Sequence, residues 1–281
     1  MDYPREMRQA TGSMICPSCG KLIGVSEEKC PFCGAWNPSF YGYAPALQKL
    51  VGQRIDLIQV IVAACIGLYV AALVIQPEAI FHFSFPFGIL QPGQRALYQL
   101  GMTSRLVWDQ GWWWTVFTAI YLHGGILHIL FNVLWIRDLA PEVTRVYGPA
   151  RAFIVFSIAG AAGFVLSDLM SGAPTIGASG SIFGLLAALI VYGRRTGSTH
   201  LSARYMQFAI VMFAFGFFMS SVNNWAHAGG FAGGWIVASV LRDMDRRESA
   251  YEILFALALL GVTLVGFVLS FIKVTGILLS R

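Results

Sequence analysis

Charged residues are scarce in this chain. Asp, Glu, Lys and Arg make up 12% of its 281 residues, whereas an average soluble domain carries about 25%. Hydrophobic residues account for 57%, and the mean hydropathy is +0.66. This balance excludes an ordinary soluble domain and indicates a protein that crosses a membrane several times.

Two other features are missing. The chain has no His-Glu-x-x-His motif and no acidic cluster inside its apolar runs, so it lacks the ligands and the general base that a zinc hydrolase normally uses. It also shows no inverted repeat and no track of charge through those runs, which argues against a transporter or channel.

What the chain does have is a series of long apolar runs. A membrane-spanning helix needs roughly 17 to 25 apolar residues. We expect an all-α polytopic membrane protein, and because the first run follows a long polar segment, we expect it to remain as an anchor rather than be cleaved as a signal peptide. The predicted spans are 56–76, 120–139, 150–170, 179–193, 206–222, 226–241 and 251–272.

Lys and Arg gather in alternate connections between these spans. The positive-inside rule assigns those connections, and the amino terminus, to the cytoplasm. We expect a cell-membrane protein, and the short loops favour a prokaryotic inner membrane. The topology also explains the net charge of +5 without a nucleic-acid partner. The residues are Lys49, Arg54, Arg145, Arg151, Arg194, Arg195, Arg204, Arg242, Arg246 and Arg247.

Four of the five cysteines form two pairs near the amino terminus, Cys16-Pro-Ser-Cys19-Gly and Cys30-Pro-Phe-Cys33-Gly. Two such pairs can supply the four thiolates of a tetrahedral zinc site. Two disulfides or a redox dithiol are the alternatives, and a reducing cytosol disfavours both. We therefore predict a structural Zn²⁺ in a zinc ribbon or knuckle, with a cytosolic protein as a candidate partner. Cys65 has no neighbour in sequence, and we give it no role.

These features divide the chain into four parts. The metal module covers 1–36, and a linker covers 37–55, where prolines and glycine break any regular period. The membrane core covers 56–241. The remainder, 242–281, is an extension that carries the last span.

A hydroxyl and an imidazole stand out inside the apolar runs. Ser179, in Gly177-Ala-Ser-Gly, begins one predicted span, and His227 lies near the start of another. Polar groups are costly in hydrocarbon, so a nucleophile and a base placed there suggest hydrolysis within the bilayer. Ser179 at a helix start also has free backbone N–H groups that could bind an oxyanion. Ser181 competes as the nucleophile, but its side chain points elsewhere around the helix.

More polar residues occupy the second span. His128 and Asn132 lie one helical turn apart, and His123 precedes them. Because unsatisfied polar groups in hydrocarbon cost several kcal/mol each, we expect these residues to share a polar focus. A catalytic metal held by His123, His128 and His227 is the alternative.

Small residues indicate how the helices meet. Gly180 and Gly184 follow Ser179 on one face, and Gly230 and Gly234 follow His227 on another. Small-xxx-small faces allow membrane helices to approach closely. Packing them together would bring Ser179 near His227.

In this order, His123-x4-His128-x3-Asn132, Gly177-x-Ser179-Gly180 and His227-x2-Gly230-x3-Gly234 resemble the motifs of rhomboid intramembrane serine proteases. The resemblance covers about 110–241. It implies a six-helix core, here followed by a seventh helix. It further implies a Ser179–His227 dyad that cleaves transmembrane protein substrates near the outer face without a cofactor. Asn132, His128 and the Ser179 amide would stabilise the oxyanion.

Some positions depart from that family pattern. Thr115 follows Trp113-Trp114 where relatives often have Arg, and Phe183 replaces a frequent Tyr while keeping an aromatic face for His227. No acidic third member is evident, and Asp168 is the candidate to orient His227. A rhomboid-like pseudoprotease that only binds transmembrane helices is the competing function, and the presence of both Ser179 and His227 argues against it.

Overall fold

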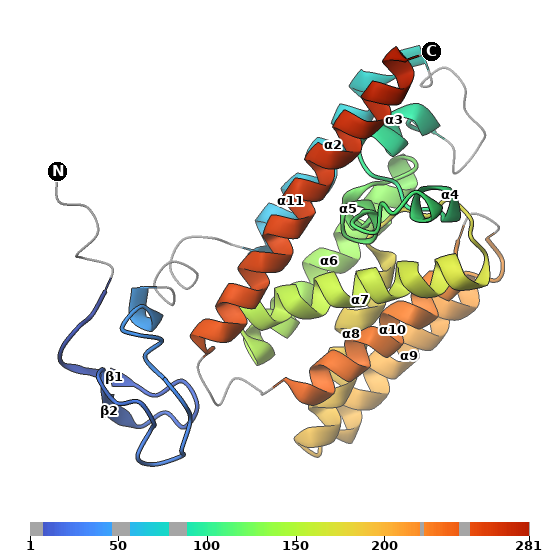
Figure 1. Ribbon diagram of the computed structural model, residues 1–281. Helices are drawn as coiled ribbons and strands as arrows, with labels where there is room; N and C mark the ends of the chain where they lie inside the picture. The colour runs from blue at the N-terminus through green and yellow to red at the C-terminus, as the bar shows by residue number, and fades with distance from the viewer. Residues whose placement is uncertain (1–7, 47–56, 79–88, 220–221, 242–247, 281) are drawn as a thin grey trace.

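The computed structural model describes residues 8–46, 57–78, 89–219, 222–241 and 248–280. Figure 1 shows a helical body with a small β-hairpin module beside one end of it. Lys49, Arg54, Arg242, Arg246 and Arg247 of the predicted charge pattern lie outside the described residues, as does 47–55 of the linker.

Seven long helices form the body in the part of the chain that the structure describes, so the predicted all-α polytopic fold is confirmed. Three of them are long and apolar enough to cross a membrane by themselves in the described chain, namely Leu57–Ile75, Pro149–Met170 and Ala250–Leu279. A bent pair, Thr115–Tyr121 with Ile126–Tyr147, passes the same test together. The seven helices are α2 (Leu57–Ile75), α6 (Ile126–Tyr147), α7 (Pro149–Met170), α8 (Ser179–Arg195), α9 (Thr199–Phe215), α10 (Asn224–Val240) and α11 (Ala250–Leu279).

Two helices begin elsewhere than predicted. The second span was expected at 120–139, with His123 at or before the helix start, and a 94° bend separates α5 (Thr115–Thr118) and η3 (Ala119–Tyr121) from α6. Gly124 and Gly125 lie at this break. The fifth helix begins at Thr199, seven residues before the predicted 206, because the Ser198 side chain caps it by accepting from the Leu201 N–H. Because the first turns of this helix are polar, a search for apolar runs does not detect its start.

Helix α8 lies at the centre of the body, against α7 and α10, and most of its side chains are buried. A Cβ on Gly230 would collide with the backbone of Gly180, and one on Gly234 with the backbone of Gly184. The predicted close approach of the two small-residue faces is therefore confirmed.

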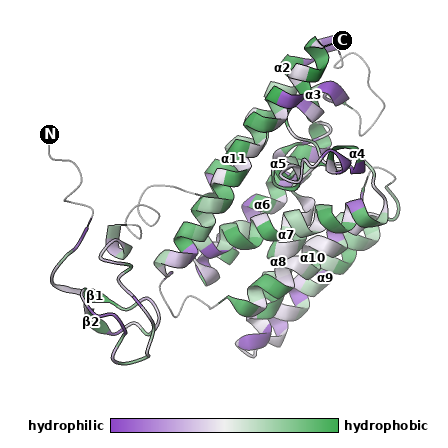
Figure 2. Cartoon of the chain, viewed as in Figure 1, coloured by the Kyte–Doolittle hydropathy of each residue, from purple (hydrophilic) through white to green (hydrophobic). Residues whose placement is uncertain are grey.

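The segment between α2 and α6 packs on the last helix. It contains α3 (Gln94–Gln99) and α4 (Arg105–Asp109), which are hydrophilic in Figure 2 whereas α2 and α11 are largely hydrophobic. The Trp114 indole donates to Ser270 Oγ at 3.0 Å, and Gln99 donates to Thr275 Oγ1 at 3.2 Å. Thr115 is fully buried and donates to the Trp112 carbonyl at 2.8 Å. Hydroxyl contacts thus brace this segment.

The amino-terminal module and the start of the linker that follows it touch the first turn of α11. Its hairpin pairs β1 (Ser13–Ile15) antiparallel with β2 (Leu22–Gly24). The Phe40 ring meets the Tyr251 ring edge-on, with centroids 5.3 Å apart. Nearby, the buried Arg151 of α7 pairs with Glu252 of α11 at 2.7 Å. Arg151, which the sequence assigns to a cytoplasmic connection, thus forms a buried ion pair that joins two helices.

Candidate active site and candidate metal centre

Ser179 and His227 meet at one end of the central helices. Ser179 is the first residue of α8, and His227 lies in the first turn of α10. Their side chains are 2.9 Å apart, measured from Ser179 Oγ to His227 Nε2. A hydroxyl in hydrogen-bond contact with an imidazole has the geometry in which a base can take the nucleophile's proton.

Gly177 shapes the loop that precedes the nucleophile. Its φ is 118°, a backbone conformation that favours glycine. A Cβ at this position would lie 2.6 Å from His128 Nε2. The first glycine of the Gly-x-Ser-Gly motif therefore serves both the turn and the close approach of His128.

The Phe183 ring packs against the imidazole ring of His227. Its ring stacks on His227 with centroids 4.4 Å apart and planes inclined by 22°. The prediction that Phe183 keeps an aromatic face for His227 is confirmed. Such a contact limits rotation of the imidazole.

His128 and Asn132 gather beside the nucleophile loop. The Gly124 N–H donates to His128 Nδ1 at 3.2 Å, so the ring proton of neutral His128 sits on Nε2, the nitrogen that faces Gly177. Asn132 Nδ2 donates to the His128 carbonyl at 2.8 Å. An amide nitrogen carries two protons, so this bond leaves one for another acceptor.

The structure does not favour the alternative metal site made of three histidines. His123 Nδ1 lies 3.2 Å from the Tyr121 carbonyl, and its ring meets His128 edge-on at 5.0 Å. Within the described residues, the only cluster of three or more His, Cys, Asp or Glu ligands that could hold a metal is the four-cysteine group.

Two further predictions concern neighbours of the dyad. Asp168 does not orient His227, because its carboxylate faces Arg105 at 3.6 Å and His227 Nδ1 has no hydrogen-bond partner among the described residues. Ser181 is fully buried, and its Oγ lies so close to Gly160 of α7 that a Cβ there would clash with it. Its hydroxyl therefore faces α7, whereas the Ser179 hydroxyl contacts His227.

Asn223, the N-cap residue that precedes α10, was not predicted from the sequence. Its side-chain oxygen accepts from the N–H groups of Trp225 and Ala226, and its amide nitrogen donates to Ser167 and Thr175. An Asn directly before an apolar run is a recognised helix-start signal and could have indicated the cap. The contacts to Ser167 and Thr175 had no local signal.

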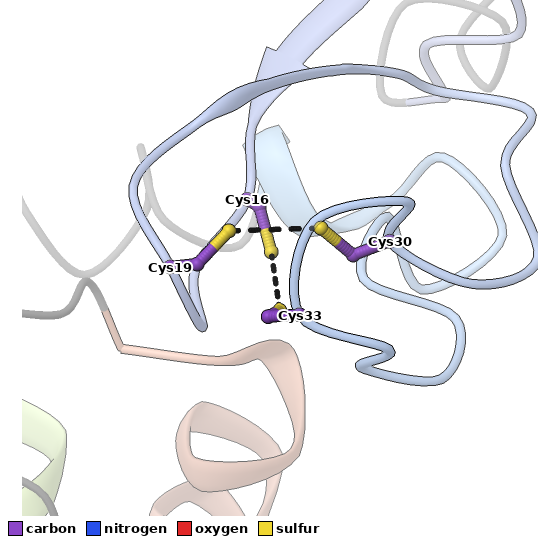
Figure 3. A group of neighbouring side chains, drawn as sticks. All are labelled: Cys16, Cys19, Cys30 and Cys33. Atoms are coloured by element: carbon purple, nitrogen blue, oxygen red, sulfur yellow. Dashed lines mark hydrogen bonds between the residues drawn. The ribbon is translucent and has the colours of Figure 1, made fainter.

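The four paired cysteines converge in the amino-terminal module (Figure 3). Their Sγ atoms all lie within 4.8 Å of one another, with Cys16–Cys33 at 3.9 Å and Cys19–Cys30 at 3.6 Å. Four sulfurs at 2.3 Å from a tetrahedral zinc ion would be about 3.8 Å apart, so the group can accommodate such an ion.

The two cysteine loops also share one backbone design. Gly20 N–H donates to the Cys16 carbonyl and Gly34 N–H to the Cys30 carbonyl, each at 2.9 Å. Both glycines have positive φ, near 70°. The glycine after each pair thus closes a tight turn that presents two thiols to the same point.

The thiols differ in acidity. Burial raises the pKa of the Cys16 thiol to about 12. Desolvation also opposes ionisation of Cys30, but the backbone N–H groups of Phe32 and Cys33 and hydrogen bonds from neighbouring thiols lower its pKa to about 7. A metal would have to displace the remaining thiol protons, so its binding would release protons and depend on pH.

Comparison with known proteins identifies the class of the chain. Residues 110–244 match the Rhomboid domain family. The putative rhomboid protease YdcA of Bacillus subtilis is 32% identical over 162 residues, which cover 55% of this chain and 76% of that protein. The chain therefore belongs to the rhomboid family.

Other relatives show how far the likeness extends. Rhomboid protease GluP of Bacillus subtilis is 34% identical over 148 residues, which cover 52% of this chain and 29% of that longer protein. RHOMBOID-like protein 5 of Arabidopsis thaliana is 26% identical over 212 residues, which cover 66% of this chain and 69% of that protein. The chain thus spans under a third of GluP's length. The matched family domain ends before α11 and begins after the cysteine module.

Proposed function

We propose that this protein is an intramembrane serine endopeptidase that cleaves transmembrane protein substrates with Ser179 and His227. The contact that carries the proposal is the 2.9 Å approach of Ser179 Oγ to His227 Nε2. Its position at the first turn of α8, inside a helical membrane fold, supports a hydrolytic site at one end of the spans. The proteases named among the relatives support the same reaction.

The reaction would proceed by acyl transfer. His227 takes the Ser179 proton as Oγ attacks the substrate carbonyl carbon, and it returns that proton to the amine that leaves when the peptide bond breaks. His227 then removes a proton from water, which hydrolyses the ester and restores the Ser179 hydroxyl. No cofactor takes part in these steps.

Negative charge on the former carbonyl oxygen needs donors. The Ser179 backbone N–H is one of the unpaired groups at the start of α8. The His128 Nε2–H faces the Gly177 loop, and Asn132 keeps one amide proton for this role. We assign oxyanion stabilisation to these three groups.

The setting of the site completes the proposal. We place it near the outer face, with the amino terminus in the cytoplasm of a prokaryotic cell and the core at 56–241. The cysteines at 16, 19, 30 and 33 would hold a structural Zn²⁺ in a module that covers 1–36. That module faces cytosol in this topology and is the candidate site for a cytosolic partner.

Proteolysis in lipid tests the proposal. The full chain, reconstituted in liposomes with a panel of single-span reporter proteins, should yield cleavage products for at least one reporter. Ser179→Ala and His227→Ala should abolish that cleavage, whereas Ser181→Ala, matched in size and position, should retain it. Cleavage that persists in Ser179→Ala would reject the assignment. Reporter binding without any cleavage by the folded wild type would favour the pseudoprotease.

A further inference from the structure

We infer that Asn223 is a positioning residue that fixes the position of His227 along the α10 axis relative to Ser179. The inference rests on the dyad proposed above. It concerns one side chain at the start of α10, four residues before the base, and the polar cluster that holds it.

The Asn223 amide uses all of its hydrogen-bonding capacity. Its Oδ1 accepts from the N–H groups of Trp225 at 3.1 Å and Ala226 at 3.2 Å. Its Nδ2 donates to Ser167 Oγ at 2.6 Å and Thr175 Oγ1 at 3.1 Å. Two acceptor sites and two donor protons are the full complement of an Asn side chain.

The two contacts of Nδ2 connect the start of α10 to two other elements. Ser167 lies near the end of α7, and Thr175 lies in the loop four residues before Ser179. Both hydroxyl-bearing residues are buried, and their oxygens are 3.1 Å apart. One amide thus joins the helix of the base, the loop of the nucleophile and α7.

The cluster continues into the segment before the bend. The Thr175 N–H donates to the Thr103 carbonyl at 2.9 Å, and Thr103 Oγ1 accepts from the Trp108 indole at 3.1 Å. Thr175 is therefore fixed on its other side as well. Thr175, to which the Asn223 amide donates, is thus held by contacts on two sides.

The direction of the hydrogen bonds makes the amide hard to replace. The Thr175 hydroxyl donates to the Ala173 carbonyl at 2.9 Å, so its oxygen is left to accept. Ser at position 223 would still cap the helix, but its shorter side chain lacks the two amide protons. Capping and anchoring can therefore be separated by mutation.

Glycines along α10 fix its distance from α7 and α8 but not its rotation or axial position. Where Gly230 meets Gly180, the contact is between backbone atoms, with no side chain from either residue to prevent sliding or rotation. The Asn223 O also accepts from the His227 N–H at 3.3 Å, which links the anchor to the base through one helical turn. Small shifts of a catalytic group reduce rates strongly.

The test compares Asn223→Ser and Thr175→Val with Ser198→Ala, which removes a cap from α9 far from the dyad. The first readout is the rate of fluorophosphonate labelling in nanodiscs as a function of pH. The second is hydrogen exchange of the peptide covering 222–228, which needs no activity. Melting temperatures are recorded for all variants.

We expect labelling to slow about 10-fold in Asn223→Ser, with an altered pH profile, and exchange at 222–228 to accelerate in both variants. Ser198→Ala should match the wild type in both readouts. Wild-type labelling rates in Asn223→Ser, or equal slowing in Ser198→Ala, would overturn the inference. If the wild type itself is not labelled, the proposed function fails, and unchanged exchange in Thr175→Val would separately overturn the anchor.

Discussion

Phe183 lies against the face of His227, with ring centroids 4.4 Å apart and an interplanar angle of 22°. The two rings belong to different helices, α8 and α10, and the contact sits one turn below Ser179. Phe183 is itself almost completely buried and also meets Phe213 edge-on, with centroids 6.3 Å apart. Packing against Phe183 thus holds the imidazole, since no acidic side chain of the described residues bonds to its Nδ1.

This contact predicts the effect of changing position 183. Phe183→Leu should slow peptide cleavage about 2- to 10-fold, because an aromatic pair contributes about 0.5 to 1.5 kcal/mol beyond its area. Phe183→Tyr keeps the ring and should cleave within about 2-fold of the wild type. Phe208→Leu, which breaks an aromatic pair with Trp135 away from the dyad, is the control. Equal rates for Phe183→Leu and Phe208→Leu would show that stacking on His227 is unimportant.

Close packing of α8 and α10 predicts a strong effect of one methyl group. Gly230→Ala would place a Cβ against the Gly180 carbonyl, a backbone contact that cannot yield by a change of rotamer. We expect about 1 to 3 kcal/mol of destabilisation and separation of the dyad. Gly261→Ala in α11 meets nothing within 4 Å and should stabilise slightly, since Ala favours helix. Thermal melting in detergent distinguishes them, and similar melting temperatures would contradict the packing account.

Metal removal should affect the module and spare the core. The purified full chain is expected to carry about one zinc ion per chain, because four thiolates complete one tetrahedral site. Cys16→Ser should lose the metal and raise hydrogen exchange across 13–24, while exchange in α7 and α8 stays unchanged. Cys65→Ser, a buried thiol in α2 outside the cluster, is the matched control and should retain the metal. Full metal content in Cys16→Ser would exclude the four-cysteine site.

Glu248 predicts a pH effect on stability. Burial raises the pKa of this carboxyl to about 7. The Glu252 charge also raises this pKa, whereas the Arg151 backbone N–H and the Arg151 charge oppose the increase. A carboxyl with a raised pKa holds its proton in the folded state at pH values where the unfolded chain has lost it. Its destabilising effect is therefore absent below about pH 4.5 and grows until about pH 7.

Glu248→Gln removes that titration. We expect the variant to exceed the wild type in stability by on the order of 2 kcal/mol at pH 8 and to match it near pH 4.5. Denaturation at both pH values measures the difference. A gap that is the same at both pH values would contradict the raised pKa.

The sequence predicted the helices well where an apolar run and a helix coincide. The first span was expected at 56–76 and is Leu57–Ile75, and the third was expected at 150–170 and is Pro149–Met170. The fifth was wrong by seven residues at each end because hydropathy reports burial in lipid, whereas helix ends depend on caps such as Ser198. Apolar counts also missed the bend before α6.

Local sequence could also suggest the dyad, because small-residue faces and matching helix ends place Ser179 near His227. It could not show that Trp114 donates to Ser270 or that Phe40 meets Tyr251, since these partners lie far apart in the chain. Those contacts give α11 a packing role along its length, from the cysteine module to the segment before α6. The proposed zinc, topology and catalytic roles remain predictions.

The most direct test of the account is to locate the activated nucleophile. The full chain in nanodiscs is treated with a fluorophosphonate, digested, and mapped by mass spectrometry, with His227→Ala and Ser181→Ala treated in parallel. The account predicts a single adduct on Ser179 that disappears in His227→Ala and persists in Ser181→Ala. An adduct on Ser181, or an equal adduct on Ser179 without His227, would contradict it.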